Sequence, residues 1–142
     1  MRRLAVVLAA LVGAVCCGGV TTGEMDYDFG PLHGRWNGEF DYAGETYSWE
    51  LWIDQYNRLN PTGRFTGRHV TSIAGDTVAT DPVTGAYNPP RVTMTFAVEL
   101  PGSPLSCEYH GQLQDSAING RISCKFADDT AVVDQAMMLS RT

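Results

Sequence analysis

The sequence predicts an all-β protein: eight antiparallel strands that follow one another as an up-and-down meander and close into a β-barrel. Apolar and polar residues alternate with period two through nearly all of residues 34–141, which is typical of strands with one buried face. Short segments rich in turn-forming residues separate the alternating stretches, and no amphipathic helical pattern interrupts them. Eight such strands hide their edges when the sheet closes on itself.

Gly, Pro, Asn and Asp mark the boundaries of the expected strands. The strands are expected at residues 34–42, 47–54, 64–73, 82–87, 91–100, 107–113, 118–126 and 132–141. A β-sandwich is the alternative fold, but it would need Greek-key crossings, whereas these loops are short. Glycine recurs on the expected inward face at Gly38, Gly67, Gly85, Gly111 and Gly120. Glycines at such positions permit the sharp coiling of a small barrel.

The register of neighbouring strands can be predicted, because opposed residues of an antiparallel pair have a constant index sum. A sum of 231 aligns the apolar faces of residues 107–113 and 118–124. It also places Cys107 opposite Cys124, which predicts a cross-strand disulfide. A sum of 179 aligns residues 83–87 with 92–96.

A sum of 118 is expected for the second and third strands. It places Asp54 opposite Arg64 and Glu50 opposite Arg68 on the outer face. Opposite charges directly across a strand pair stabilise a sheet, and these two pairs are the basis for that register.

The N-terminus reads as an export signal in residues 1–17. A short cationic start precedes an apolar stretch at residues 4–15, which is too short to span a bilayer comfortably. Cys16 and Cys17 follow and are candidates for lipidation, so a lipid anchor and simple secretion both remain open. A polar, acidic linker at residues 18–33 would lead to the barrel domain at 34–142. We expect a periplasmic, extracellular or envelope-anchored protein, in which a disulfide is permitted.

The charge of the chain excludes some partners. The formal net charge is -6, so phosphates would repel the protein, and nucleic acid and anionic membrane surfaces are not expected to bind it. A membrane would be reached only through a lipid on Cys16 or Cys17. The charge is expected to keep an exported protein soluble.

The first and last strands resemble those of the calycins, the barrels of lipocalins, fatty-acid-binding proteins and avidins. Gly34-Arg35-Trp36 is similar to the Gly-x-Trp signature of their first strand, and the ending around Arg141 resembles their last strand. The resemblance implies that Arg141 packs across Trp36 and closes the barrel base, a cation–π contact. It does not carry over a biotin site, because the binding residues of avidins have no counterparts here. Tyr42-Ala43-Gly44-Glu45 also replaces the long first loop that covers a lipocalin cup.

The inward face is rich in aromatic residues, and two interpretations remain open. Eight strands enclose just enough room for side chains to fill the barrel, so the aromatics could plug it. Alternatively, they could line a narrow apolar cup whose tyrosine hydroxyls orient a small ligand. The candidate ligand-binding residues are Tyr42, Tyr47, Trp49, His69, Tyr87, Phe96 and Tyr109. The mouth would be formed by the loops near residues 43–44, 74–77, 100–106 and 127–131.

The sequence does not favour an enzyme. His69 is the one titratable side chain expected inside, and a hydrogen-bonded core histidine is the alternative to a catalytic one. Alternation predicts no inward carboxylate, which leaves no pair of acids for general acid–base chemistry. No serine occupies a nucleophile turn, no Gly-rich loop precedes a helix, and no histidine pair has metal-ligand spacing. We therefore expect no metal and no cofactor.

Two functions fit these sequence patterns. The first is an exported barrel that binds a small apolar or aromatic ligand in its mouth. The alternative is an envelope structural or protein-interaction module with a filled barrel. The outward residue Trp52 bears on the alternative, because it is either a solitary exposed tryptophan or, with Val70 and Tyr56, a contact for self-association or a partner.

Overall fold

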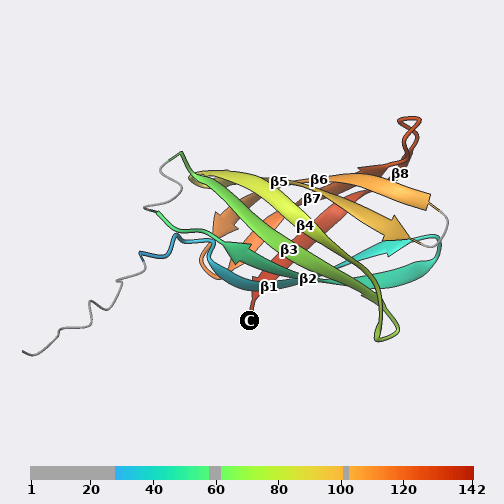
Figure 1. The fold of residues 1–142 in the computed structure, drawn as a ribbon, viewed down its shortest axis with the longest axis horizontal. Coiled ribbons are helices and arrows are strands. Elements are labelled where there is room, and N and C mark those ends of the chain that lie inside the picture. The colour runs from blue at the N-terminus through green and yellow to red at the C-terminus, as the bar shows by residue number, and fades with distance from the viewer. Residues whose placement is uncertain (1–27, 58–61, 101–102) are drawn as a thin grey trace, which may run out of the picture.

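The computed structural model describes residues 28–57, 62–100 and 103–142. It confirms the predicted all-β meander, because eight antiparallel strands pair in chain order and close into a barrel (Figure 1). The strands are β1 (Gly34–Tyr42), β2 (Glu45–Asp54), β3 (Arg64–Ile73), β4 (Asp76–Asn88), β5 (Arg91–Leu100), β6 (Ser103–Gln114), β7 (Ala117–Lys125) and β8 (Ala131–Arg141).

Some predictions concern residues outside these ranges. The expected signal segment with Cys16 and Cys17 and most of the expected linker belong to residues 1–27, which the structure does not describe. Within the described ranges, no helix is long and apolar enough to cross a membrane.

The barrel has two different ends. At one end, which we call the mouth, β1 turns into β2 at Ala43–Gly44 and β3 turns into β4 at Ala74–Gly75; β5 and β7 end there, and β6 and β8 begin there. The two turns are tight because both residues in each have positive φ, from 50° to 89°, as type I′ hairpins require. The other end, the base, holds the segment that precedes β1 and the C-terminus.

The base is closed by Trp36 and its neighbours. Trp36 is fully buried and its Nε1 donates a hydrogen bond to the Leu32 carbonyl at 2.9 Å. Arg141 lies opposite Trp36 across β1 and β8, with its guanidinium 4.6 Å from the centre of the indole ring. The expected contact between Arg141 and Trp36 is therefore confirmed. Arg141 also donates a hydrogen bond to the carbonyl of Pro31, which ties the N-terminal segment to the base.

Two predicted registers are confirmed. In β6 and β7, Cys107 lies opposite Cys124 and Gly111 opposite Gly120. The two cysteines form a disulfide with a Cα–Cα distance of 4.1 Å. In β4 and β5, Val83 lies opposite Phe96, as the index sum of 179 predicts.

The register predicted for β2 and β3 is wrong by two residues. Glu50 lies opposite Val70, and Asp54 opposite Thr66. Because the shift is even, the inward and outward faces are unchanged, but the two expected charge pairs do not form. Glu50 instead makes an ion pair with Arg35 of β1. The long connection from β2 to β3 explains the error, since only a tight turn fixes a register by its length.

β4 begins six residues earlier than expected. Its first half, residues 76–82, pairs with β3 and contains a bulge opposite Thr71 and Ser72. Within the described residues, β4 pairs with β5 only from the position where Asn88 lies opposite Arg91 to the position where Val83 lies opposite Phe96. β4 therefore has a free edge toward the mouth. Pro82, which lacks an N–H, is tolerated where this edge begins.

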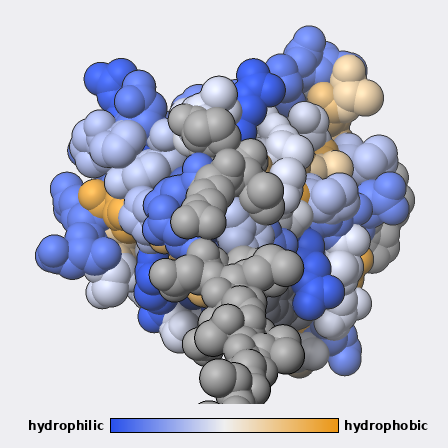
Figure 2. All heavy atoms as spheres, turned by 60° about the vertical axis from the view of Figure 1, so that its left-hand side comes forward, coloured by the Kyte–Doolittle hydropathy of each residue, from blue (hydrophilic) through white to orange (hydrophobic). Residues whose placement is uncertain are grey.

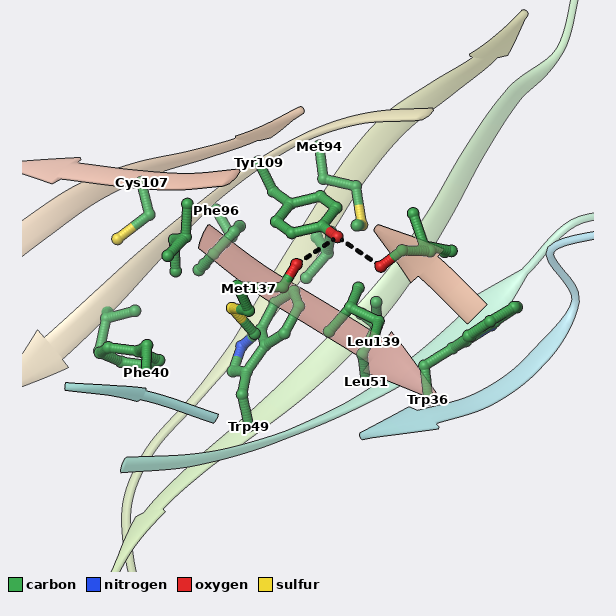
Figure 3. Close-up of a cluster of buried hydrophobic side chains, with 14 of the residues drawn as sticks. Trp36, Phe40, Trp49, Leu51, Met94, Phe96, Cys107, Tyr109, Met137 and Leu139 are labelled. Atoms are coloured by element: carbon green, nitrogen blue, oxygen red, sulfur yellow. Dashed lines mark hydrogen bonds between the residues drawn. The ribbon is translucent and has the colours of Figure 1, made fainter. Parts of the chain in front are cut away.

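Side chains fill the barrel interior from the base to the level of Phe40 (Figure 3). The predicted inward glycines make room for them: a Cβ on Gly120 would lie 2.6 Å from the Tyr109 ring and 2.4 Å from the His110 carbonyl oxygen. The Tyr109 hydroxyl lies 2.9 Å from the Ile118 carbonyl oxygen and 3.0 Å from that of Met137. Tyr109 thus braces three strands from inside.

The outer surface around the base is mostly hydrophilic. Figure 2 brings this side of the molecule forward and shows small, separate hydrophobic areas among hydrophilic residues. Such scattered apolar residues are usual for a soluble protein surface.

Candidate functional site

The mouth half of the barrel has an incompletely buried apolar rim. Its members are inward hydrophobic residues near the mouth ends of β1, β3, β4, β7 and β8, and each packs against the core while remaining partly exposed. They are Tyr42, Ile73, Val78, Phe126 and Val132. At the base, the corresponding place is taken by fully buried Leu32 and Trp36. Two other residues of this class, Tyr87 and Leu113, lie near the base, so the mouth has more of these partly exposed apolar residues than the base does.

Below the rim lies a layer of aromatic rings that pack in two groups. Tyr42 contacts Tyr47 at 6.2 Å between ring centres, and Tyr47 stacks on Phe40 at 5.5 Å. Deeper in the barrel, Trp49 stacks on Phe96 at 4.7 Å. Such offset and stacked rings stabilise a core beyond their buried area. In this conformation the layer is the floor of the mouth.

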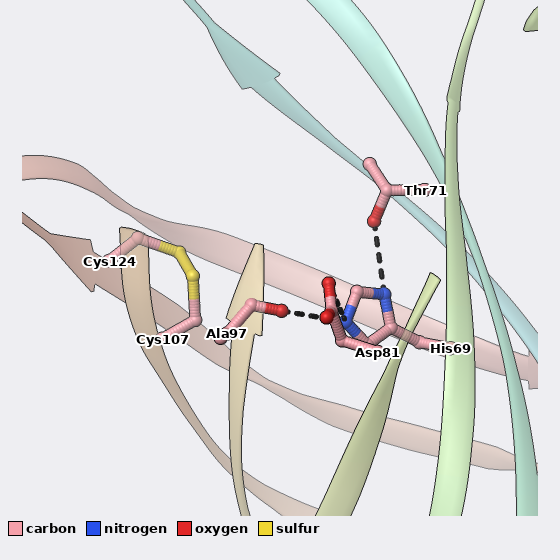
Figure 4. A network of polar contacts seen from close by, with 6 residues as sticks. All are labelled: His69, Thr71, Asp81, Ala97, Cys107 and Cys124. Atoms are coloured by element: carbon pink, nitrogen blue, oxygen red, sulfur yellow. Dashed lines mark hydrogen bonds and ion pairs between the residues drawn. A yellow bond between two sulfur atoms is a disulfide. The ribbon is translucent and has the colours of Figure 1, made fainter. Parts of the chain in front are cut away.

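His69 lies within this layer and is held at both ring nitrogens (Figure 4). Its Nε2 is 2.8 Å from the Ala97 carbonyl oxygen, and its Nδ1 is 3.1 Å from Thr71 Oγ1. A carbonyl oxygen only accepts, so Nε2 carries the proton. In the neutral ring, Nδ1 then accepts a hydrogen bond from the Thr71 hydroxyl. This pair of bonds fixes both the tautomer and the orientation of the ring.

Burial keeps His69 neutral. Desolvation lowers its pKa from the ordinary 6.5, and the bond to Ala97 and the charge of Asp81 oppose that change without reversing it. A neutral, oriented histidine that contacts Trp49 and Phe96 at 5.7 and 5.1 Å between ring centres is a satisfied core residue in this conformation.

Asp81 corrects the prediction that no carboxylate faces inward. It lies opposite His69 in β3 and β4, with Oδ2 4.0 Å from His69 Nε2. Oδ2 is buried and has no hydrogen-bond partner among the described residues, although the side chain as a whole is 22% exposed. The prediction failed because the strand was expected to begin at Pro82. Extending the alternation of Val83 and Gly85 back by one step places Asp81 inside.

Trp49 has a second unpaired polar atom in the same half. Its side chain is 1% exposed, and Nε1 is buried without a hydrogen-bond partner in the described part of the chain. Buried polar atoms are nearly always paired, so each exception needs an explanation. A third such atom, Nδ1 of His33, lies at the base in a half-buried ring that stacks on Phe29 at 4.0 Å.

The structure brings most of the candidate ligand residues together, but not all of them. Tyr42, Tyr47, Trp49, His69 and Phe96 lie in the mouth half. Tyr109 lies deeper, where burial raises the pKa of its hydroxyl above the usual range. Tyr87 is near the end of β4 at the base, where its N–H bonds to the Gly63 carbonyl. It is therefore remote from the mouth.

Sequence reasoning missed Asp81, Thr71 and Ala97 as parts of one polar cluster. The alternation could have found Asp81, and it already placed Thr71 on the inward face. No sequence signal marks Ala97, because its contribution is a backbone carbonyl that becomes reachable where β4 stops pairing with β5.

A separate hollow lies on the outer face of β8, β1, β2 and β3. Its volume is about 550 Å³, and its lining includes polar residues such as Asn37, Glu39 and Ser48 together with Val70 and Met138. Met138 is 57% exposed. Trp52, also outward, is half-buried because the guanidinium groups of Arg35 and Arg68 lie 5.0 and 4.9 Å from its ring centre.

Comparison with known proteins finds one distant structural match. No family model and no curated protein matches the chain. A solved structure that matches is that of Rv2717c from M. tuberculosis, with 12% sequence identity and a TM-score of 0.44 over 79% of this chain and 93% of that chain. A similarity this distant supports no argument about function.

Proposed function

We propose that this protein is an exported barrel of calycin type that binds a small apolar or aromatic compound at its mouth. The observation that carries the proposal is the contrast between the two ends: the base is sealed by Trp36 and Arg141, whereas the rim at the mouth stays partly exposed around an aromatic floor. Ligand sites in small barrels are expected at such apolar mouths. The ligand would rest on Tyr42 and Tyr47 above the filled interior.

The test compares a rim variant with a matched base variant. Native mass spectrometry of the purified protein, with and without a panel of small aromatic compounds, should detect a bound ligand. Val132→Asp should abolish binding because it places a charge on the rim. Leu113→Asp changes an equally half-buried residue at the base and should leave binding intact, provided that circular dichroism shows both variants folded. Binding lost equally in both variants, or absent from the wild type, would refute the proposal.

Export is supported by the disulfide between Cys107 and Cys124, since such bonds persist in oxidising compartments. The cationic and apolar start of the chain supports it as well. Mass spectrometry of the protein from cell fractions should find the chain shortened at its N-terminus, with or without lipid on Cys16 or Cys17. A full-length cytosolic chain would refute export.

A second candidate function, a protein-interaction module, is favoured by one observation. Exposed Met138 and half-buried Val70 both line the hollow on the outer face, and apolar residues that cluster at a surface mark interaction sites. Met138→Asp should then abolish self-association or partner binding. Unchanged sedimentation of the wild type and the variant, together with an unchanged set of co-purifying partners, would count against this function.

A further inference from the structure

Two buried polar atoms without partners occupy the mouth half of the barrel. One is a donor, Nε1 of Trp49, and the other is an acceptor, Oδ2 of Asp81. Leaving such groups unpaired destabilises a fold, so a protein that keeps both has a use for them or fills the space with water. Trp49 is almost completely buried, at 1% exposure, so bulk solvent does not satisfy its N–H.

The two side chains belong to one cluster. Trp49 packs on Phe96 and His69, with ring centres 4.7 and 5.7 Å away. Asp81 Oδ2 is 4.0 Å from Nε2 of the same His69. Figure 4 shows Asp81 and the Ala97 carbonyl on one side of the His69 ring and Thr71 beyond Nδ1. Since His69 already uses both nitrogens, it cannot also satisfy Asp81.

The wall of the barrel can give way beside this cluster. Residues 76–82 of β4 pair with β3, and in the described residues the pairing of β4 with β5 starts only at Val83. An unpaired strand edge opens more readily than one held on both sides. Asp81 lies on this segment, and its side chain is 22% exposed. A small molecule that rests on the mouth floor therefore needs only a local displacement of β4 to reach Asp81.

We propose that Trp49 Nε1 and Asp81 Oδ2 recognise the polar end of the ligand, and that the ligand is an apolar or aromatic molecule bearing a hydroxyl or a primary amide. This inference rests on the proposed binding function at the mouth. Hydroxyl and primary amide groups each carry a donor and an acceptor. The ligand donor bonds to the Asp81 carboxylate, and its acceptor receives the Trp49 N–H. The rings of Trp49 and Phe96 contact the apolar body.

A site built this way should discriminate strongly. A ligand that lacks the polar group would leave both protein atoms unpaired, and sites of this kind reject such analogues far better than apolar pockets reject an extra methylene. Charge repulsion also disfavours carboxylate ligands, because Asp81 would face a second anion. The expected ligands are therefore neutral at the polar end, since a cationic end would offer no acceptor to the Trp49 N–H.

The experiment uses two probes of nearly equal shape, 2-naphthol and 2-methylnaphthalene, and measures their dissociation constants by equilibrium dialysis with the full chain. Trp49→Phe removes the donor, and Asp81→Leu removes the acceptor. Each variant should weaken the binding of 2-naphthol relative to that of 2-methylnaphthalene, so that the ratio of the two dissociation constants changes by about tenfold or more. The matched controls are Trp52→Phe, on the outer face of the same strand, and Asp54→Leu, an exposed acid at the end of that strand. Both controls should leave the ratio unchanged.

Thermal melting provides a readout without ligand. Asp81→Leu should melt at or above the wild-type temperature, because it removes a buried oxygen that nothing in the empty protein satisfies. If Asp81 instead holds a structural water or stabilises the fold by itself, the variant should melt several degrees lower. That result would overturn the inference even if the variant cannot be used for binding.

The outcomes separate this inference from the proposed function. If both probes bind and their ratio is the same in all five proteins, the mouth binds ligands but Trp49 and Asp81 do not recognise them. If neither probe nor any panel compound binds the wild type, the proposed function and this inference fail together. A crystal structure in which 2-naphthol is bound while a water molecule still bridges the two atoms would also overturn the inference.

Discussion

Trp36 and Trp49 show how differently the two halves of the barrel are built. Both indoles are buried. At the base, the Trp36 N–H bonds to the Leu32 carbonyl at 2.9 Å, and Arg141 covers the ring. In the mouth half, the Trp49 N–H has no partner in the described chain, and Asp81 Oδ2 nearby has none either. The base pairs its buried tryptophan within the protein and leaves one buried polar atom unpaired, Nδ1 of the half-buried His33, whereas the mouth half leaves both a donor and an acceptor without partners.

The difference extends to the wall of the barrel. At the base, the strands pair with both neighbours and the segment before β1 packs underneath, where Gln55 accepts a hydrogen bond from the Leu32 N–H at 2.8 Å. Toward the mouth, β4 pairs on one side only. The disulfide joins β6 and β7 in this same half. We infer that a covalent link compensates for the weaker closure of the mouth half, whereas packing and hydrogen bonds hold the base.

Among the changes that test this comparison, removal of the disulfide should have the largest effect on the free energy of unfolding. Replacing Cys107 and Cys124 by alanine removes a link between residues 17 apart in sequence. For a loop of that length, chain entropy predicts a loss of about 3 kcal/mol of unfolding free energy at most. Denaturant unfolding of the variant measures the loss, and hydrogen exchange should locate the increased opening in the mouth half. Equal melting temperatures of the wild type with and without reductant would contradict the proposed role.

The two tryptophans should respond unequally to the same substitution. Trp36→Phe shrinks a buried ring, leaves the Leu32 carbonyl unpaired and weakens the contact with Arg141, a combined cost of about 2 kcal/mol. Trp49→Phe also shrinks a ring, but it removes an unpaired N–H, so we expect a loss of only about 1 kcal/mol.

Chemical denaturation at neutral pH tests this difference, with Trp52→Phe on the outer face as the control for tryptophan loss in general. A greater loss in Trp49→Phe than in Trp36→Phe would mean that the Trp49 N–H is already satisfied. The contrast between the two halves would then disappear.

The base was more predictable from sequence than the mouth half, and the reason is physical. Alternation fixes which residues face inward. The resemblance to the calycins implied the contact between Trp36 and Arg141, and a closed meander places their two strands side by side. Tight turns fix registers, so Cys107 was correctly placed opposite Cys124 across the short turn between β6 and β7. Neither alternation nor the register set by a tight turn depends on contacts between distant parts of the chain.

The mouth half depends on departures from regular pairing, which alternation alone does not reveal. The bulge opposite Thr71 and the separation of β4 from β5 decide that Ala97 offers its carbonyl to His69. Pro82 was interpreted as the start of a strand, although it marks only the point where one edge of a longer strand is free. Because of that interpretation, Asp81 was not predicted to face inward. The long β2–β3 connection similarly allowed a register error of two residues.

The smallest expected effect concerns pH and again tests the buried polar cluster of the mouth half. Burial lowers the pKa of His69 below 6.5 in the folded protein, so as the pH falls below that value the unfolded chain takes up a proton first. The unfolded state is then favoured, and the stability due to neutral His69 is lost between pH 6.5 and the lower folded pKa, by at most about 1.4 kcal/mol per pH unit.

His69→Gln keeps a donor for Ala97 and an acceptor for Thr71 but does not titrate. Unfolding free energies at pH 7.5 and 5.5 should therefore fall more for the wild type than for His69→Gln, whereas His110→Gln, which changes an exposed histidine, should follow the wild type. If all three proteins lose the same stability, burial does not hold His69 neutral. The mouth half would then tolerate a buried charge as readily as the base tolerates the charge of Arg141 at its surface.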